Sequence, residues 1–192
     1  KMVINKKKIL IILISLVIII LIIKVADNMS PPPKIEDYLK DIGFTNEGES
    51  ALYYKQISEI DEEQYQRAVS NKMNATYEFI YFNINNNQLT KNKMTYEDEI
   101  TETFIPTYDY TNQKLTYTYR FVYNNANVIF EGEYNLKTTK FTCENTYSYK
   151  FDLEIGKEAI CEKVKYDIED FKKEAETLIT NQKLLKSFRN ST

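Results

Sequence analysis

The chain has 192 residues and a formal net charge of −3, and it contains neither histidine nor tryptophan. Histidine is the usual general base and the commonest metal ligand, so its absence excludes serine–histidine catalysis, cysteine–histidine catalysis and histidine-ligated zinc. The two cysteines are too few for a structural zinc site, and the excess of acidic residues repels a phosphate backbone. We therefore expect no nucleic-acid partner, no cofactor and no enzymatic activity.

Residues 9–23 form the most apolar stretch of the chain. Fourteen of these fifteen residues are isoleucine, leucine or valine, and Ser15 is the exception. A helix with no polar face is typical of a membrane span, and extension from Val3 to Ala26 brings it to the roughly 20 residues that a bilayer requires. We expect residues 1–26 to be a cytoplasmic flank and a transmembrane anchor in the lipid bilayer. The anchor positions are Ile9, Leu10, Leu13, Leu16, Ile19 and Ile23.

The charges on the two sides of this stretch predict its orientation. Four lysines and no acidic residue precede it, whereas Asp27, Glu36 and Asp37 follow it. Because basic flanks stay in the cytoplasm, we expect a single-pass protein of the cell membrane with its N-terminus inside and its C-terminal domain outside. A cleaved signal peptide is the alternative. It fits the basic start, but a cut after Ala26 would place Lys24 where a small residue is required.

The segment after the anchor divides into a linker and one domain. Residues 27–33 contain three consecutive prolines, which favour a stiff, extended linker. We expect residues 34–192 to form a single extracytoplasmic domain. Apolar residues at helical spacing predict its first helix, which Gly43 closes. These residues are Ile35, Tyr38, Leu39 and Ile42.

From residue 52 onwards, much of the chain has the alternating pattern of half-buried strands. One short helix interrupts this pattern, and Asp61 with Gln64 has the spacing of a capping box at its start. Pro106 is expected to end one strand, and short turns predict an antiparallel meander of about five to six strands. The expected strands are residues 52–58, 75–84, 93–104, 115–123, 128–136 and 141–149.

The last segment returns to helical spacing and predicts a long C-terminal helix over about residues 158–186, with an interruption near Asp167. Its apolar stripe needs a partner, and the apolar faces of the strands provide one. The expected fold class is therefore α+β, with the short N-terminal helix and the long C-terminal helix on one face of the sheet. We expect Tyr119, Phe130 and Phe171 to meet in one core cluster.

Cys143 and Cys161 are the two cysteines of the chain. Cys143 is in phase with Tyr147 and Tyr149 on the expected buried face of the last strand, and Cys161 belongs to the C-terminal helix. An extracytoplasmic compartment allows a disulfide to persist, so we expect this pair to be bonded. Two buried free thiols are the alternative.

Two acidic clusters, at residues 61–63 and 97–102, are candidates for carboxylate chemistry. Paired carboxylates can hydrolyse glycosides, and clustered oxygens can bind calcium. Neither cluster has a calcium-loop pattern, and carboxylates that are close in sequence usually mark a solvated face. We therefore expect no catalytic, cofactor-binding or metal-binding residue.

These features favour a membrane-anchored binding module of the cell envelope. The expected partner is another envelope protein, a peptide or a small apolar ligand held between the sheet and its helices. The alternative is a structural subunit of an envelope assembly, which would expose an apolar patch over a packed core. A third hypothesis, a hydrolase that uses carboxylates alone, requires two carboxyl groups that face each other across a cleft.

Overall fold

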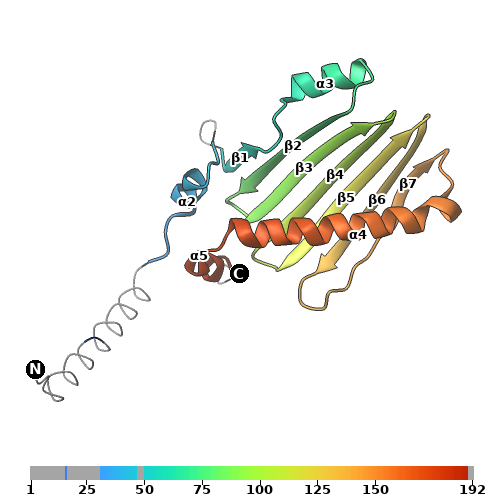
Figure 1. Cartoon of the computed structure of the whole chain (residues 1–192). Helices are drawn as coiled ribbons and strands as arrows, with labels where there is room; N and C mark the ends of the chain where they lie inside the picture. Colours follow the sequence, from blue (N-terminus) through green and yellow to red (C-terminus); the bar gives the residue numbers. More distant parts are fainter. Residues whose placement is uncertain (1–15, 17–30, 47–49, 190–192) are drawn as a thin grey trace, which may run out of the picture. The chain divides into compact units, whose positions relative to one another are not determined.

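The structure is a computed structural model that describes residue 16, residues 31–46 and residues 50–189 (Figure 1). The chain divides into two compact units, residues 1–32 and 33–192. The expected anchor at residues 9–23 lies outside the described residues, apart from Leu16. Within the part of the chain that is described, no helix combines the length and the apolar character that a membrane crossing requires.

In residues 50–189, seven strands form one antiparallel sheet in which each strand pairs with the next one in the sequence. The strands are β1 (Leu52–Gln56), β2 (Ala75–Asn83), β3 (Gln88–Glu97), β4 (Ile100–Asp109), β5 (Lys114–Tyr123), β6 (Ala126–Asn135) and β7 (Glu144–Tyr149). The described helices are α2 (Ile35–Asp41), α3 (Glu62–Ser70), α4 (Leu153–Leu178) and α5 (Gln182–Arg189). The α+β class is confirmed, with seven strands in place of the expected five to six.

The segment 93–104 is the centre of a hairpin and not a single strand. β3 ends at Glu97 and β4 begins at Ile100, and the residues between them, Asp98 and Glu99, have φ values of 50° and 67°. Two residues in the left-handed region make the tight turn that matches the twist of a hairpin. Asparagine and glycine are the usual residues at such a turn. Because two acidic residues stand there instead, the alternating pattern continues through the turn.

Pro106 lies inside β4 and does not end it. On the β3 side, the register pairs Thr90 with Thr107 and Lys93 with Phe104, and the pairs between them are missing. Proline has no N–H group to donate, so the ladder is interrupted on that side alone. On the β5 side the register is continuous, and the strand runs on to Asp109.

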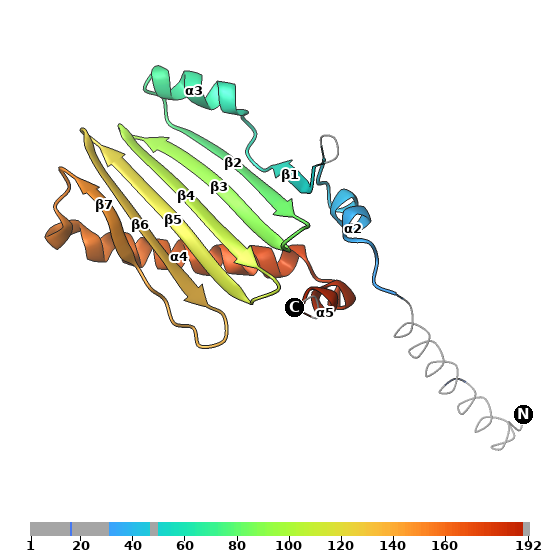
Figure 2. The same cartoon turned by 180° about the vertical axis from the view of Figure 1, so that it is seen from behind.

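Helix α4 crosses one face of the sheet, as the two opposite views in Figures 1 and 2 show. Its apolar stripe, which includes Ile168 and Ala175, is fully buried. Tyr119 and Phe130 are register partners on β5 and β6, and both lie in the same core cluster as Phe171. The predicted meeting of these three aromatic residues is confirmed, so the helix and the sheet share one hydrophobic core.

The last strand departs from the expected alternation. Tyr147 and Tyr149 are 47% and 50% exposed, although a buried position was expected for both. Along β7 the register passes from Asn145 to Tyr147 over a single step of β6, so Thr146 is an extra residue. A bulge of this kind shifts the alternation by one residue. The two tyrosines therefore lie on the face of the sheet that α4 does not cover.

The C-terminal helical segment is interrupted after Leu178, and not near Asp167. Asn181 caps the following helix α5, because its side-chain oxygen accepts hydrogen bonds from the backbone N–H groups two and three residues later, at 3.0 and 3.3 Å. The hydroxyl of Tyr38 on α2 donates to the carbonyl oxygen of Leu178 at 2.9 Å. The N-terminal helix is thereby docked on the end of α4.

Cys143 and Cys161 are joined by a disulfide, and their Cα atoms lie 5.9 Å apart. The bond links the segment before β7 to α4 across a sequence separation of 18 residues. In the chain-entropy description, closing a loop of this length stabilises the folded state by about 3 kcal/mol. The first half of α4 is therefore held covalently as well as by its core contacts.

Replacement of Phe171 by alanine tests how much the core depends on α4. Phe171 is 2% exposed, so Phe171→Ala is expected to lower the free energy of unfolding by about 3–5 kcal/mol. Tyr166 belongs to the same helix but is 72% exposed, so Tyr166→Ala should change it by about 0.5 kcal/mol at most. Denaturant unfolding followed by circular dichroism measures both variants. Equal stabilities would show that α4 adds nothing to the core.

Candidate ligand-binding site

The α4 side of the sheet changes from apolar to polar toward the start of β2. α4 contacts β4 and β5, and Ile80 of β2 is buried. Alternate residues of a strand share a face, so Thr76 and Glu78 lie on the same side as Ile80. The register places residues of β3 opposite them. We call the resulting group the polar strip, and it consists of Thr76, Glu78, Lys91, Lys93 and Thr95.

Lys91 is the centre of the polar strip. Its ammonium group forms ion pairs with Glu78 of β2, at 2.9 Å, and with Glu174 of α4. The same group lies 5.8 Å from the ring centre of Phe171. Burial alone would lower the pKa of Lys91, but the hydrogen bonds to Glu174 and Glu78 outweigh it, and the pKa is raised. Lys91 therefore stays charged and links α4 to the first half of β2.

A second ion-pair cluster joins α4 to the start of β4. Lys163 Nζ lies 3.0 Å from Glu102 and 3.1 Å from Asp167. The hydroxyl of Tyr119 donates to Glu102 at 2.8 Å. Burial and the adjacent Glu102 carboxylate raise the pKa of Tyr119, so the phenol remains protonated at neutral pH. This cluster holds the first half of α4 on the sheet.

Helix α3 stands beside the start of β2. The Asp61 carboxylate accepts a hydrogen bond from the backbone N–H of Gln64 at 2.8 Å, and the Gln64 side chain accepts one from the backbone N–H of Asp61 at 2.9 Å. The predicted capping box is thus confirmed. Tyr65 of α3 is 3% exposed, and its ring centre lies 6.3 Å from that of Tyr77 on β2. The ring contact fixes the helix against the strand.

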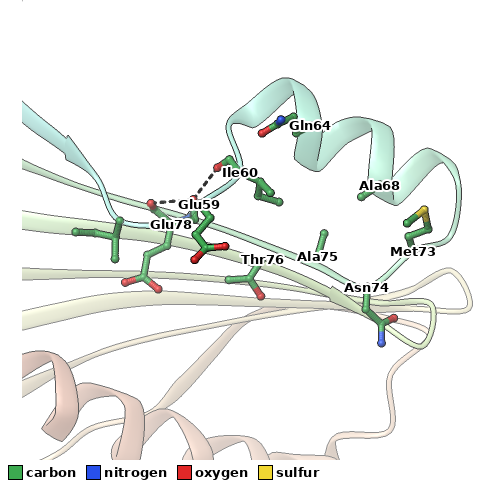
Figure 3. Close-up of a pocket in the computed structure, with 11 residues that line it drawn as sticks. Glu59, Ile60, Gln64, Ala68, Met73, Asn74, Ala75, Thr76 and Glu78 are labelled. Atoms are coloured by element: carbon green, nitrogen blue, oxygen red, sulfur yellow. Dashed lines mark hydrogen bonds between the residues drawn. The ribbon is translucent and has the colours of Figure 1, made fainter.

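A pocket of about 660 Å³ lies between α3 and the start of β2. Figure 3 shows Gln64 and Ala68 on the helix side of this pocket and Thr76 and Glu78 on the strand side. The rest of the wall comes from the segments that connect α3 to the sheet. The volume is within the range of sites that hold a small ligand.

Two apolar side chains in the wall of the pocket are exposed to solvent. Met73 is 60% exposed and Ile57 is 43% exposed. Ile60, Ala68 and Ala75 continue the apolar surface into the pocket. Isolated apolar residues are common on a protein surface, but a group that lines one hollow is typical of a binding site. The pocket therefore offers an apolar wall to a ligand.

Carboxylates give the pocket a negative charge. Glu59 and Glu78 both line it. Glu78 shares Lys91 with Glu174, and none of the described basic residues forms an ion pair with Glu59. Glu59 is thus the carboxylate of the pocket whose charge is left for a ligand. Its negative charge favours a ligand that carries positive charge.

The residues singled out from the sequence lie mostly outside this pocket. The disulfide is next to β7, at the opposite end of the strand order from β2. In the acidic cluster 97–102, Glu99 forms an ion pair with Lys72 at 2.8 Å. Across the described ranges, no three potential ligands of a metal ion come together. Gln64 of the predicted capping box is the one pocket residue that a sequence motif had picked out.

Removal of the Lys91 charge tests the role of the polar strip. In Lys91→Met, the carboxylates of Glu78 and Glu174 would face each other without a cation. We expect the free energy of unfolding at neutral pH to fall by about 2–3 kcal/mol, less than for a fully buried pair, because Glu174 is 33% exposed. The loss should be constant across the neutral range and shrink only in alkaline solution, where Lys91 of the parent chain gives up its proton.

The sign of the effect in the parent chain follows from the raised pKa of Lys91. The stabilisation that comes from its charged form is complete at neutral pH and is lost only as the pH rises through that pKa. Chemical denaturation at neutral and alkaline pH measures the difference between parent and variant. Lys93→Met is the matched control, because no ion pair joins Lys93 to another described residue. A loss that does not shrink in alkaline solution would contradict this account.

Comparison with known proteins reveals no relative. No protein-family model matches the chain, and no curated protein and no solved structure shows a significant match to it. The fold and the geometry of the pocket are therefore the grounds on which a function is inferred.

Proposed function

We propose that the chain is a membrane-anchored binding module of the cell envelope that holds its ligand in the pocket between α3 and β2. The observation that carries this proposal is an open pocket of about 660 Å³ with an apolar wall and two carboxylates, of which Glu59 forms no ion pair with another described residue. Such a site suits an amphipathic ligand with an apolar part and a positive charge. The expected apolar ligand between α4 and the sheet has no room, because Phe171 and its neighbours fill that space.

The membrane anchor in this proposal is supported by the sequence. Residues 9–23 are apolar in all but one position, lysines precede them, and a proline-rich segment at residues 27–33 follows. An anchor, a stiff linker and a domain with an open pocket are the parts of a module that meets its ligand near a membrane surface. In this proposal the domain lies outside the cell.

A structural subunit of an envelope assembly is the second candidate function. The observation that favours it is the exposure of Tyr147 and Tyr149 on β7, the last strand of the sheet. A carboxylate-only hydrolase has weaker support, because Glu78 of the pocket is already ion-paired with Lys91. The binding module is preferred because it accounts both for the pocket between α3 and β2 and for the negative charge of that pocket.

Filling the pocket tests the binding function. Ala68→Trp places a large ring in the space between α3 and β2, whereas Gln66→Trp places the same ring on an exposed position of the same helix. In the full chain in detergent micelles, cationic amphipathic fragments should bind the Gln66→Trp variant but not the Ala68→Trp variant. Saturation-transfer NMR measures binding, and circular dichroism verifies folding. Equal binding by both folded variants would place the ligand elsewhere.

Protease accessibility tests the proposed topology. Because lysines precede the apolar stretch and acidic residues follow it, protease added to intact cells should digest the domain at residues 34–192 and leave the apolar segment in the membrane fraction. The measurement is immunoblotting with tags at the two ends of the chain. Recovery from the culture medium of a protein that begins near Asp27 would contradict the anchor.

A further inference from the structure

Among the described strands, none pairs with the outer side of the start of β2. β1 pairs with β2 only between Phe79 and Asn83. Beyond Gln56 the chain leaves the sheet and leads to α3. The outer edge of β2 from Ala75 to Tyr77 is therefore not paired with β1, and Ala75 and Thr76 line the pocket.

The hydrogen bonds of Glu78 reveal how this edge is oriented. Its backbone N–H donates to Ser58 Oγ at 3.1 Å, and its carbonyl oxygen accepts from the N–H groups of Ile57 and Ser58 at 2.9 and 3.1 Å. Both backbone groups of Glu78 thus point away from β3. In an antiparallel strand this direction alternates from residue to residue, so the N–H and carbonyl groups of Thr76 also point away from β3.

Thr76 lines the pocket on its strand side (Figure 3). Within the described residues, no backbone or side-chain group forms a hydrogen bond with the outward N–H and carbonyl of Thr76. A strand edge with one donor and one acceptor in register is the element that binds an extended peptide by strand addition. The apolar wall and the carboxylates of Glu59 and Glu78 lie beside it.

We propose that this pocket binds a short, extended and basic peptide segment, which adds to the outer edge of β2 through the backbone of Thr76. This inference rests on the proposed binding function and names the class of its ligand. The free edge spans three residues, about 10 Å, so a segment of about three to five residues fits it. Residues of the segment alternate between the apolar wall and the solvent, and a basic side chain pairs with Glu59, which forms no ion pair with another described residue.

One substitution removes the backbone donor without touching the paired side of the strand. In Thr76→Pro the N–H that faces the pocket is lost, and proline is tolerated where the N–H of an edge strand is unpaired. Thr76→Val is the matched control, because it removes the hydroxyl and keeps the backbone donor. The probe is an acetylated and amidated pentapeptide of sequence Lys-Val-Thr-Val-Lys, titrated onto the full chain in detergent micelles by isothermal calorimetry.

The peptide should bind the parent and Thr76→Val equally, and Thr76→Pro should bind about tenfold more weakly. A second measurement needs no variant. The amide hydrogen of Thr76 should exchange rapidly in the free chain and at least about tenfold more slowly when the peptide is bound. The same peptide with glutamate in place of both lysines should bind much more weakly. This comparison isolates the charge from the backbone contact.

Each other outcome overturns a defined part of the inference. If the lysine peptide does not bind, or binds without slowing exchange at Thr76, strand addition is wrong. If cationic fragments still bind in the pocket in that case, the proposed binding function stands and only the peptide class fails. If neither fragments nor peptide bind, both fail. Equal affinity for the lysine and glutamate peptides would overturn the charge preference.

Discussion

One helix has to cover a sheet of seven strands, and the rest of the structure depends on how far it reaches. The 26 residues of α4 are about 39 Å long, which is enough to cross seven strands spaced about 4.8 Å apart. The helix is only about 10 Å wide, whereas a ten-residue strand is about 33 Å long. α4 therefore covers a band across the strands and leaves the ends of the long strands β2 to β6 without cover.

The two ends of the strands that α4 leaves uncovered differ in the residues that complete them. At one end α2 and α5 complete the core, and Leu39, Leu184 and Phe188 are buried there. At the other end, none of the described helices adds such an apolar cover at the start of β2, and the face becomes the polar strip around Lys91. An ammonium group shared by two carboxylates satisfies buried charge without apolar cover. Two residues of this strip, Thr76 and Glu78, line the pocket beside α3.

The sequence predicts the parts of this fold that rest on periodicity, and it misses those that rest on single residues. Alternation predicts that Tyr119 and Phe130 are buried under Phe171, and the structure confirms it. The extra residue Thr146 inverts the phase of β7, and no local signal of this bulge stands out in the sequence. The sequence does not predict the pocket, because the pocket arises from the position of α3 beside β2. Tertiary contacts set that position, such as the contact between Tyr65 and Tyr77.

The position of α3 also explains how an unpaired strand edge can persist in a stable domain. An open edge invites pairing with any extended chain and is a common origin of aggregation. Here β1 covers the second half of β2, and α3 stands beside the first half, held through Tyr65. The helix thus stands where a long added strand would continue, and the pocket leaves open the part of the edge at Thr76. The helix that blocks aggregation at this edge therefore also limits which ligands can reach Thr76.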